Sequence, residues 1–304
     1  MGFHFGYAQE NWYSMINRLA LGTVQFGLDY GIVNKSGRVR PDEVASILNV
    51  AADHGIDLLD TAISYGESER VLGVMGVADW KIVSKLPPVP DGISDVPAWI
   101  KNQIERSLVR LGAKRLYGLL LHRPDQLIGP FGPLLLEALE GMKREGLVQK
   151  IGISVYAPGD LVRLSQVMHI ELVQIPMSIF DRRLIESGWA GRLKQQGTEI
   201  HVRSVFLQGL LLMPAAYRPQ KFSRWSAVWA IWDQWLNHTS VTPLQACLRY
   251  ALGIDEVDKV LVGVDSANQL REILVASEGE LDSLPAWPQQ LDLDLINPTR
   301  WVNL

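Results

Sequence analysis

Three short apolar runs of the sequence end in ionisable residues, and a tyrosine follows the first of them. The run IDLLD ends at Asp60, KIVSK at Lys85 and YGLLLH at His122, and Tyr65 lies five residues after Asp60. If the runs are neighbouring parallel strands, their carboxyl ends meet at one edge and bring the four side chains together. Each residue alone has an ordinary structural explanation, such as a capping carboxylate or a core histidine. Four of them at three consecutive strand ends are hard to assign to chance.

This set of residues suits the protonation of a carbonyl oxygen. A free tyrosine has a pKa of about 10, too high for an acid at neutral pH, but a nearby ammonium lowers the pKa of a phenol. Lys85 would supply the ammonium, Asp60 would keep it charged and in place, and His122 would orient the carbonyl. The sequence therefore predicts Tyr65 as a general acid while another group delivers hydride to the carbon.

The elements that would position these residues recur along the chain. Runs rich in Val, Ile and Leu are apolar on both faces, as buried parallel strands are. They lie at 18–23, 56–60, 81–85, 117–122, 150–154, 171–175, 199–204 and 259–264. Segments with helical spacing lie between several of them, at 44–55, 96–112, 134–146, 161–169 and 242–253. The alternation predicts a single-domain (β/α)8 TIM barrel over residues 15–304. A doubly wound sheet is the alternative, but GTVQFGLDYG after the first run lacks the GxGxxG pattern.

Composition narrows the class of protein. The chain has 304 residues, of which 47% are hydrophobic and 20% charged, so it is globular. A net charge of −4 disfavours nucleic-acid binding, and no apolar run has the length of a membrane span. Cys247 is the only cysteine, which suits a reducing compartment. We expect residues 1–14 to be a non-functional extension without a secretory signal, and the protein to be cytoplasmic.

The stretch at 205–240 interrupts the alternation with RWSAVWAIWDQW. The spacing of its tryptophans predicts an extra helix packed on the barrel, and the alternative is an aromatic wall over the substrate site. Candidate substrate-binding residues are Phe26, Tyr30, Trp225 and Trp229. The C-terminal segment is expected to be an extended tail packed on the barrel.

From about residue 17 to 275 the sequence resembles the aldo-keto reductase superfamily. The resemblance rests on GTVQFG, LDTAISYGESERVLG at 59–73, SKLP at 84–87, LLLHRPD at 119–125, GIS at 152–154, QIPMSIFDRR at 174–183, RSVFLQGLL at 203–211, TPLQACLRYAL at 242–252 and VGVDSANQL at 262–270. It implies a (β/α)8 barrel that binds NADPH in an extended form and reduces an aldehyde or ketone, such as a sugar-derived one, with Tyr65, Lys85, Asp60 and His122 as the catalytic residues. The cofactor-binding residues that it implies are Gly22, Thr23, Ser154, Gln174, Arg203, Ser204, Gln208, Gly209, Gly263, Asp265, Ser266 and Gln269.

Two departures from the family pattern concern the nicotinamide. The family places Ser-Asn after the fifth strand, but Val155 follows Ser154 here, so the carboxamide loses one of its expected partners at a cost of about 1 kcal/mol. Gln174 matches the remaining partner. Arg203 stands where the family commonly has an aromatic residue, and its charge would favour the reduced cofactor over the cationic oxidised form. Arg203 could instead pair with an acidic neighbour or bind a phosphate of the substrate.

A third departure concerns the 2′-phosphate of NADPH. The family grips this phosphate with Lys or Arg after the eighth strand, whereas GVDSANQLRE offers Asp265 and a single base, Arg271. Asp265 could repel a phosphate or accept from a ribose hydroxyl. NADPH is therefore the first expectation and NADH the alternative.

Two other classes of function remain open from the sequence. One is a low-turnover binding or regulatory protein that keeps the reductase fold, which the intact catalytic set opposes. The other is a barrel isomerase or lyase without a nicotinamide cofactor. No carboxylate cluster for a metal accompanies the motifs, so no metal site is predicted.

Overall fold

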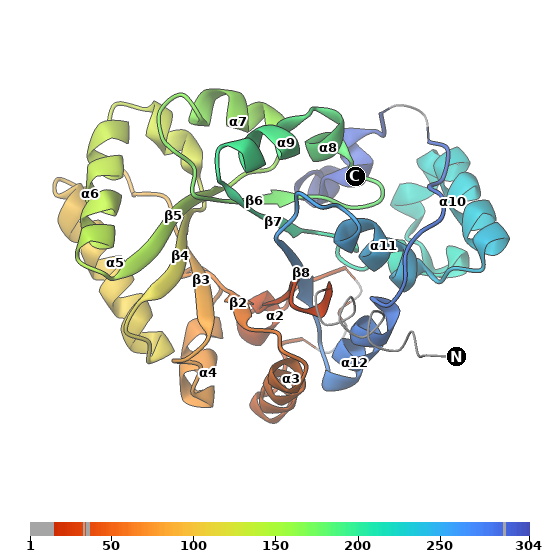
Figure 1. Cartoon of the computed structure of the whole chain (residues 1–304), viewed down its shortest axis with the longest axis horizontal. Helices are drawn as coiled ribbons and strands as arrows, with labels where there is room; N and C mark the ends of the chain where they lie inside the picture. Colours follow the sequence, from red (N-terminus) through yellow and green to blue (C-terminus); the bar gives the residue numbers. More distant parts are fainter. Residues whose placement is uncertain (1–14, 33, 35–36, 288–289) are drawn as a thin grey trace, which may run out of the picture.

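A computed structural model describes residues 15–32, 34, 37–287 and 290–304 (Figure 1). Within these residues, eight parallel strands close into one barrel in chain order. The strands are β1 (Leu19–Gly22), β2 (Leu58–Asp60), β3 (Lys81–Leu86), β4 (Leu116–Leu121), β5 (Val148–Ser154), β6 (Leu172–Pro176), β7 (Glu199–Arg203) and β8 (Lys259–Gly263). The predicted (β/α)8 barrel and its eight strands are confirmed. The predicted extension at 1–14 lies outside the described residues.

Side chains that point into the barrel form layers along its axis. The middle layer is apolar and contains Ala20, Leu58, Val83, Leu120, Leu172 and Leu261. Toward the amino ends of the strands, Lys150 on β5 and Tyr117 on β4 both bond the carboxylate of Glu199 on β7. Toward the carboxyl ends, Asp60 accepts hydrogen bonds from both Lys85 and Gln174. The apolar middle layer therefore separates a structural ion cluster from the polar groups at the opposite rim.

Helices cover the outside of the barrel. They are α2 (Val24–Gly27), α3 (Pro41–Asp53), α4 (Ser68–Met75), α5 (Val96–Leu111), α6 (Gly132–Arg144), α7 (Pro158–Leu164), α8 (Arg183–Glu186), α9 (Trp189–Gln195), α10 (Ser226–Thr239), α11 (Pro243–Leu252), α12 (Ala267–Ala276) and α13 (Leu293–Ile296). The helices predicted at 44–55, 96–112, 134–146 and 242–253 correspond to α3, α5, α6 and α11. The helix predicted at 161–169 begins earlier, as α7. Pro158 suits its first turn, and Asp160 accepts from the N–H of Ala157 at 3.1 Å.

The tryptophan-rich stretch forms the predicted extra helix. It comprises the 3-10 turn η4 (Gln220–Trp225) and α10, which lies at the right-hand margin of Figure 1, outside the ring of strands. Trp229 and Trp232 both pack on Phe180, and their ring centroids lie 5.3 and 5.4 Å, respectively, from that of Phe180. The C-terminal segment is not wholly extended, because it forms α13 and the 3-10 turn η5 (Pro298–Asn303), with Trp301 buried. Trp301 packs edge to face on Phe222, with the two ring centroids 4.9 Å apart, so the C-terminal segment is packed on the protein as predicted but is partly helical rather than extended.

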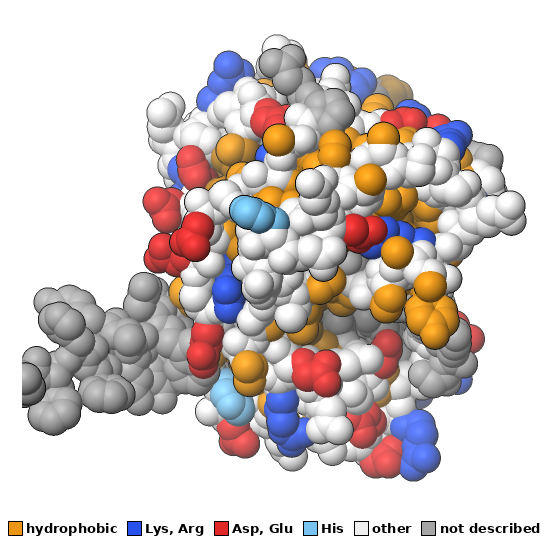
Figure 2. Space-filling model, turned by 90° about the vertical axis from the view of Figure 1, so that its right-hand side faces the viewer, with side chains coloured by type: hydrophobic (Ala, Val, Ile, Leu, Met, Phe, Trp, Pro, Cys, Tyr) orange, Lys and Arg blue, Asp and Glu red, His pale blue; other side chains and the backbone are white. Residues whose placement is uncertain are grey.

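The surface of the described residues carries mixed charge. Figure 2 shows acidic and basic side chains interspersed over one face, with hydrophobic side chains between them. Among the described residues, the structure contains no helix of sufficient length and apolar character to cross a membrane.

Candidate active site

A buried ion pair links the ends of β2 and β3. The Nζ atom of Lys85 donates to both carboxylate oxygens of Asp60, at 2.8 and 2.7 Å, and to the backbone carbonyl of Thr61 at 2.9 Å. The Lys85 side chain is 1% exposed. Burial alone would lower the pKa of Lys85, but the Asp60 carboxylate and the Tyr65 side chain beside it outweigh burial and raise that pKa. Lys85 is therefore a fixed, fully charged ammonium.

Tyr65 lies beside this ammonium. The Lys85 Nζ atom is 4.9 Å from the centroid of the Tyr65 ring. The turn that carries the tyrosine is closed by a hydrogen bond from the N–H of Ser68 to the Tyr65 carbonyl, at 3.0 Å. A Cβ atom on Gly27 would overlap the same carbonyl, so only glycine lets α2 pack against this turn. The loop after β2 is therefore held rigidly by its neighbours.

His122 follows β4 directly and completes the predicted set. Its ring meets that of Tyr65 edge to face, with centroids 6.1 Å apart. Burial, followed by the positive charges of Lys85 and Arg203, lowers the pKa of His122 from 6.5 to about 4. At neutral pH the imidazole is uncharged. The hydroxyl of Ser64 lies 3.4 Å from Nδ1, and an uncharged ring can donate from Nε2 when Nδ1 accepts.

This pKa predicts how His122 titrates. A histidine signal that titrates near pH 4 rather than 6.5 is expected in a titration followed by NMR, and it disappears in His122→Asn. The lowered pKa also makes the free energy of unfolding depend on pH. Because the unfolded chain takes up the proton first, the stabilisation that comes from uncharged His122 is fully present above pH 6.5. It is lost as the pH falls from 6.5 towards 4. A His122 signal with a midpoint near 6.5 in the folded protein would contradict this prediction.

A second buried carboxylate, Glu69 on α4, supports the same region. Glu69 accepts from the hydroxyl of Ser84 at 2.8 Å, from that of Ser107 at 2.6 Å and from Arg110 at 2.5 Å. It thereby ties α4 to α5 and to the residue that precedes Lys85. The role of Glu69 is not predicted from the sequence. Glu69 lies between Ser68 and Arg70 in the first turn of α4, and this local pattern is also typical of an exposed helix start, so it gives no signal of burial.

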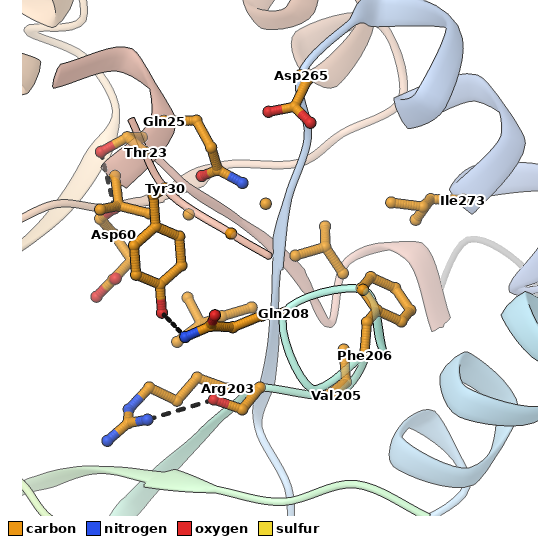
Figure 3. A pocket seen from close by; sticks show the side chains of 18 of the residues that line it. Thr23, Gln25, Tyr30, Asp60, Arg203, Val205, Phe206, Gln208, Asp265 and Ile273 are labelled. Carbon is orange, nitrogen blue, oxygen red and sulfur yellow. Dashed lines mark hydrogen bonds between the residues drawn. The ribbon is translucent and has the colours of Figure 1, made fainter. Parts of the chain in front are cut away.

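A cavity of about 550 Å³ opens above the carboxyl ends of the strands. Asp60, Tyr65 and His122 line it, while Lys85 lies beneath the lining. Of the predicted cofactor-binding residues, Ser266 does not line the cavity, and the following do: Gly22, Thr23, Ser154, Gln174, Arg203, Ser204, Gln208, Gly209, Gly263, Asp265 and Gln269. Figure 3 shows Arg203 and Asp265 at opposite ends, with Gln208 between them. The cavity therefore extends from the ionisable set to the region between β8 and α12.

Of the four predicted substrate-binding residues, one lines the cavity and three do not. Tyr30 lines the cavity, and its hydroxyl accepts from Gln208 at 3.3 Å. Phe26, Trp225 and Trp229 are buried and do not line the cavity. Trp229 packs on Phe180, and the indole N–H of Trp225 donates to Asp292 at 3.1 Å. Helical spacing identifies a buried face, but it does not indicate which neighbour that face contacts.

Several residues that line the cavity are not predicted as site residues from the sequence. These are Val24, Gln25, Gly31, Tyr156, Val205, Phe206, Leu212, Leu244, Leu261, Val262, Glu272 and Ile273. Tyr156 matters most for the electrostatics, because the Arg203 guanidinium lies 4.6 Å from its ring centroid and donates to the carbonyl of Val155 at 3.2 Å. Arg203 is thus held in place, and it has no carboxylate partner among the residues that the structure describes.

The residues near β5 and β6 fit the carboxamide of a nicotinamide. The Nε2 atom of Gln174 donates to Asp60 at 2.6 Å, while its Oε1 atom is buried and has no partner among the described residues. Ser154 lies beside it in register on β5, and both line the cavity. A buried acceptor without a donor is costly, and an amide N–H₂ group would satisfy it. Val155 is buried and does not line the cavity.

Comparisons with known proteins identify the family to which the chain belongs. A family model described as "Aldo/keto reductase family" matches residues 18–284. The chain is 34% identical to aflatoxin B1 aldehyde reductase member 2 of Rattus norvegicus over 41% of this chain and only 36% of that protein. It is 27% identical to D-threo-aldose 1-dehydrogenase of a Pseudomonas species over 83% of this chain and 89% of that protein.

A solved structure supports the fold in the same way. The aldo-keto reductase AKR11C1 from Bacillus halodurans, in its holo form, superposes with a TM-score of 0.66 at 22% identity. The match covers 89% of this chain and 88% of that one. A closed barrel whose rim gathers Asp60, Tyr65, Lys85 and His122, together with a family model that spans most of the sequence, leads to one conclusion: the chain belongs to the aldo/keto reductase family of oxidoreductases.

Proposed function

We propose that this protein reduces an aldehyde or ketone with a reduced nicotinamide nucleotide. The observation that carries the proposal is the buried Lys85–Asp60 pair beneath Tyr65, beside an uncharged His122, at the base of one cavity. A reduced nicotinamide supplies hydride when it is bound. Ser154 and the free Oε1 atom of Gln174 would hold its carboxamide.

The side chains of the protein would supply the proton and stabilise the charge that its transfer leaves behind. Tyr65 donates its phenolic proton to the carbonyl oxygen, and the Lys85 ammonium stabilises the phenolate that remains. Asp60 compensates the charge of Lys85, and both side chains are buried. His122, being uncharged, orients the carbonyl oxygen through a hydrogen bond rather than competing with Tyr65 as the acid.

The substrate is a small or sugar-like carbonyl compound. The cavity combines the hydroxyl and amide groups of Tyr30 and Gln208 with the guanidinium of Arg203, and these groups suit a hydroxylated molecule. The names of two relatives, a D-threo-aldose 1-dehydrogenase and an L-galactose dehydrogenase, refer to sugars. The resemblance that predicts NADPH as first choice leaves NADH open, and the lining near α12 bears on that choice.

A fluorescence titration with NADPH and with NADH tests the proposal. The chain has ten tryptophans, so energy transfer to a bound reduced nicotinamide gives a strong signal. Saturable binding, followed by oxidation of the nucleotide in the presence of aldoses and small aldehydes, is the expected result. Binding without turnover across such a panel would favour a low-turnover binding protein, and absence of binding would overturn the proposal.

Arg203 gives a prediction about the oxidation state of the nucleotide. Its guanidinium lines the cavity and pairs with no carboxylate in the described part of the chain. A second positive charge on an oxidised nicotinamide would be repelled by about 1 kcal/mol even in a water-like medium. The reduced form should therefore bind about fivefold more tightly than the oxidised form, and Arg203→Gln should reduce this preference. Equal affinities for the two forms in calorimetry would contradict the prediction.

A further inference from the structure

The end of the cavity near α12 is acidic. Asp265, Gln269 and Glu272 line it, and Arg203 is the one Lys or Arg among all the residues that line the cavity. Figure 3 places Arg203 at the other end. Arg271, the base closest to this segment in the sequence, is exposed and donates to Asn268 at 2.8 Å. An anionic group at this end would therefore face carboxylates, and no Lys or Arg side chain of the lining would lie there to bind it.

Three backbone N–H groups at the start of α12 are already occupied. The N–H of Ala267 donates to the Glu43 carboxylate at 2.6 Å, and that of Gln269 donates to the Ser266 hydroxyl at 3.2 Å. The N–H of Asp265 donates to the side chain of Gln269 at 2.8 Å. A helix N-terminus often binds a phosphate, but here the first N–H of α12 already donates to the carboxylate of Glu43 on α3. Glu43 therefore adds a third negative charge at this end.

Two acceptors at the same end lack donors. The Oδ1 atom of Asp265 and the Oε1 atom of Gln25 are buried and have no partner among the described residues. Both residues line the cavity, and Figure 3 shows them at the end opposite Arg203. Buried acceptors call for an N–H or O–H group from a ligand. A ribose diol has two O–H donors, whereas a phosphate dianion has none.

We infer that this cavity selects the nucleotide without a 2′-phosphate, NADH, through Asp265, Glu272 and Glu43. The inference rests on the proposed function and specifies which nucleotide the protein uses. The 2′-hydroxyl of the adenosine ribose would donate to Asp265, and a phosphate at that position would be repelled by all three carboxylates. The choice differs from the NADPH that the family resemblance favours. Asp265 and Glu272 are specificity residues of the lining, whereas Glu43 acts from behind it by capping α12.

Parallel titrations with NADH and NADPH, followed by the quenching of tryptophan fluorescence, test the inference. NADH should bind at least tenfold more tightly, since one hydrogen bond to a carboxylate is worth about that factor and repulsion of the phosphate adds to it. Equal binding, or tighter binding of NADPH, would overturn the inference and leave the proposed reductase function intact. If neither nucleotide binds, the proposed function fails together with the inference.

Charge-neutralising variants assign the selectivity to residues. The triple substitution Glu43→Gln, Asp265→Asn and Glu272→Gln keeps an acceptor at each position and removes the three negative charges. It should tighten NADPH binding at least tenfold and weaken NADH binding, because the ribose hydroxyl then donates to an uncharged amide oxygen in place of a carboxylate. Glu278→Gln is the matched control, because Glu278 is exposed beyond the end of α12 and does not line the cavity. An equal gain for NADPH in the control, or none in the triple variant, would overturn the assignment.

Discussion

Replacing Tyr65 by phenylalanine should abolish carbonyl reduction almost completely while nucleotide binding stays within a few-fold. The variant removes one hydroxyl and leaves the ring against Lys85 and His122, so the packing of the site is kept. A positioned general acid contributes a factor on the order of 10²–10⁴ to the rate. The expected result is therefore a fall in kcat of at least a hundredfold, measured by oxidation of the reduced nucleotide.

Tyr30→Phe is the matched control for this prediction. Tyr30 lines the same cavity and also carries a phenol, but its hydroxyl contacts Gln208 rather than Lys85. The control should raise KM for a hydroxylated substrate more than it lowers kcat, because the lost hydroxyl binds rather than reacts. If Tyr65→Phe retains a tenth or more of the activity, another group is the acid and the proposed role of Tyr65 is wrong.

The sequence predicts the barrel and the proximity of the four ionisable residues for a physical reason. Runs that are apolar on both faces form parallel strands, and parallel strands in a closed barrel bring their carboxyl ends together. Asp60 and Lys85 could thus be placed at one rim from their positions at the ends of apolar runs. The ion pair between them, at 2.7 Å, follows from adjacent strands in the barrel. What these residues do with a substrate remains a prediction.

Other features depend on contacts that no local pattern encodes. The spacing of Trp225 and Trp229 predicts a buried helical face, but the contact with Phe180 rather than with the cavity depends on how α10 packs. Glu272 reads as an ordinary exposed helical residue, yet it lines the cavity because of where α12 lies on the barrel. The contact between Glu43 and α12 joins residues 224 positions apart in the sequence. Tertiary packing decides all three.

Removing the charge of Lys85 should affect both stability and activity. Lys85→Met deprives Asp60 of its ion-pair partner and leaves a carboxylate with a side chain only 8% exposed. Breaking one partner of a buried pair costs about 3–5 kcal/mol of the free energy of unfolding, because the remaining charge is uncompensated. The phenolate of Tyr65 also loses its stabilising ammonium, so kcat should fall on the order of a hundredfold or more.

A double variant separates these two effects. Adding Asp60→Asn to Lys85→Met removes the orphaned charge and keeps an acceptor for the amide of Gln174, which donates to Asp60 in the native chain. Urea unfolding should then show most of the lost stability restored, because neutral groups are far less costly to bury than a lone carboxylate. Activity should stay as low as in the single variant, since no ammonium faces Tyr65. Recovery of activity together with stability would mean that Lys85 only supports the fold, and the assignment of its charge to the proton-transfer step would have to be abandoned.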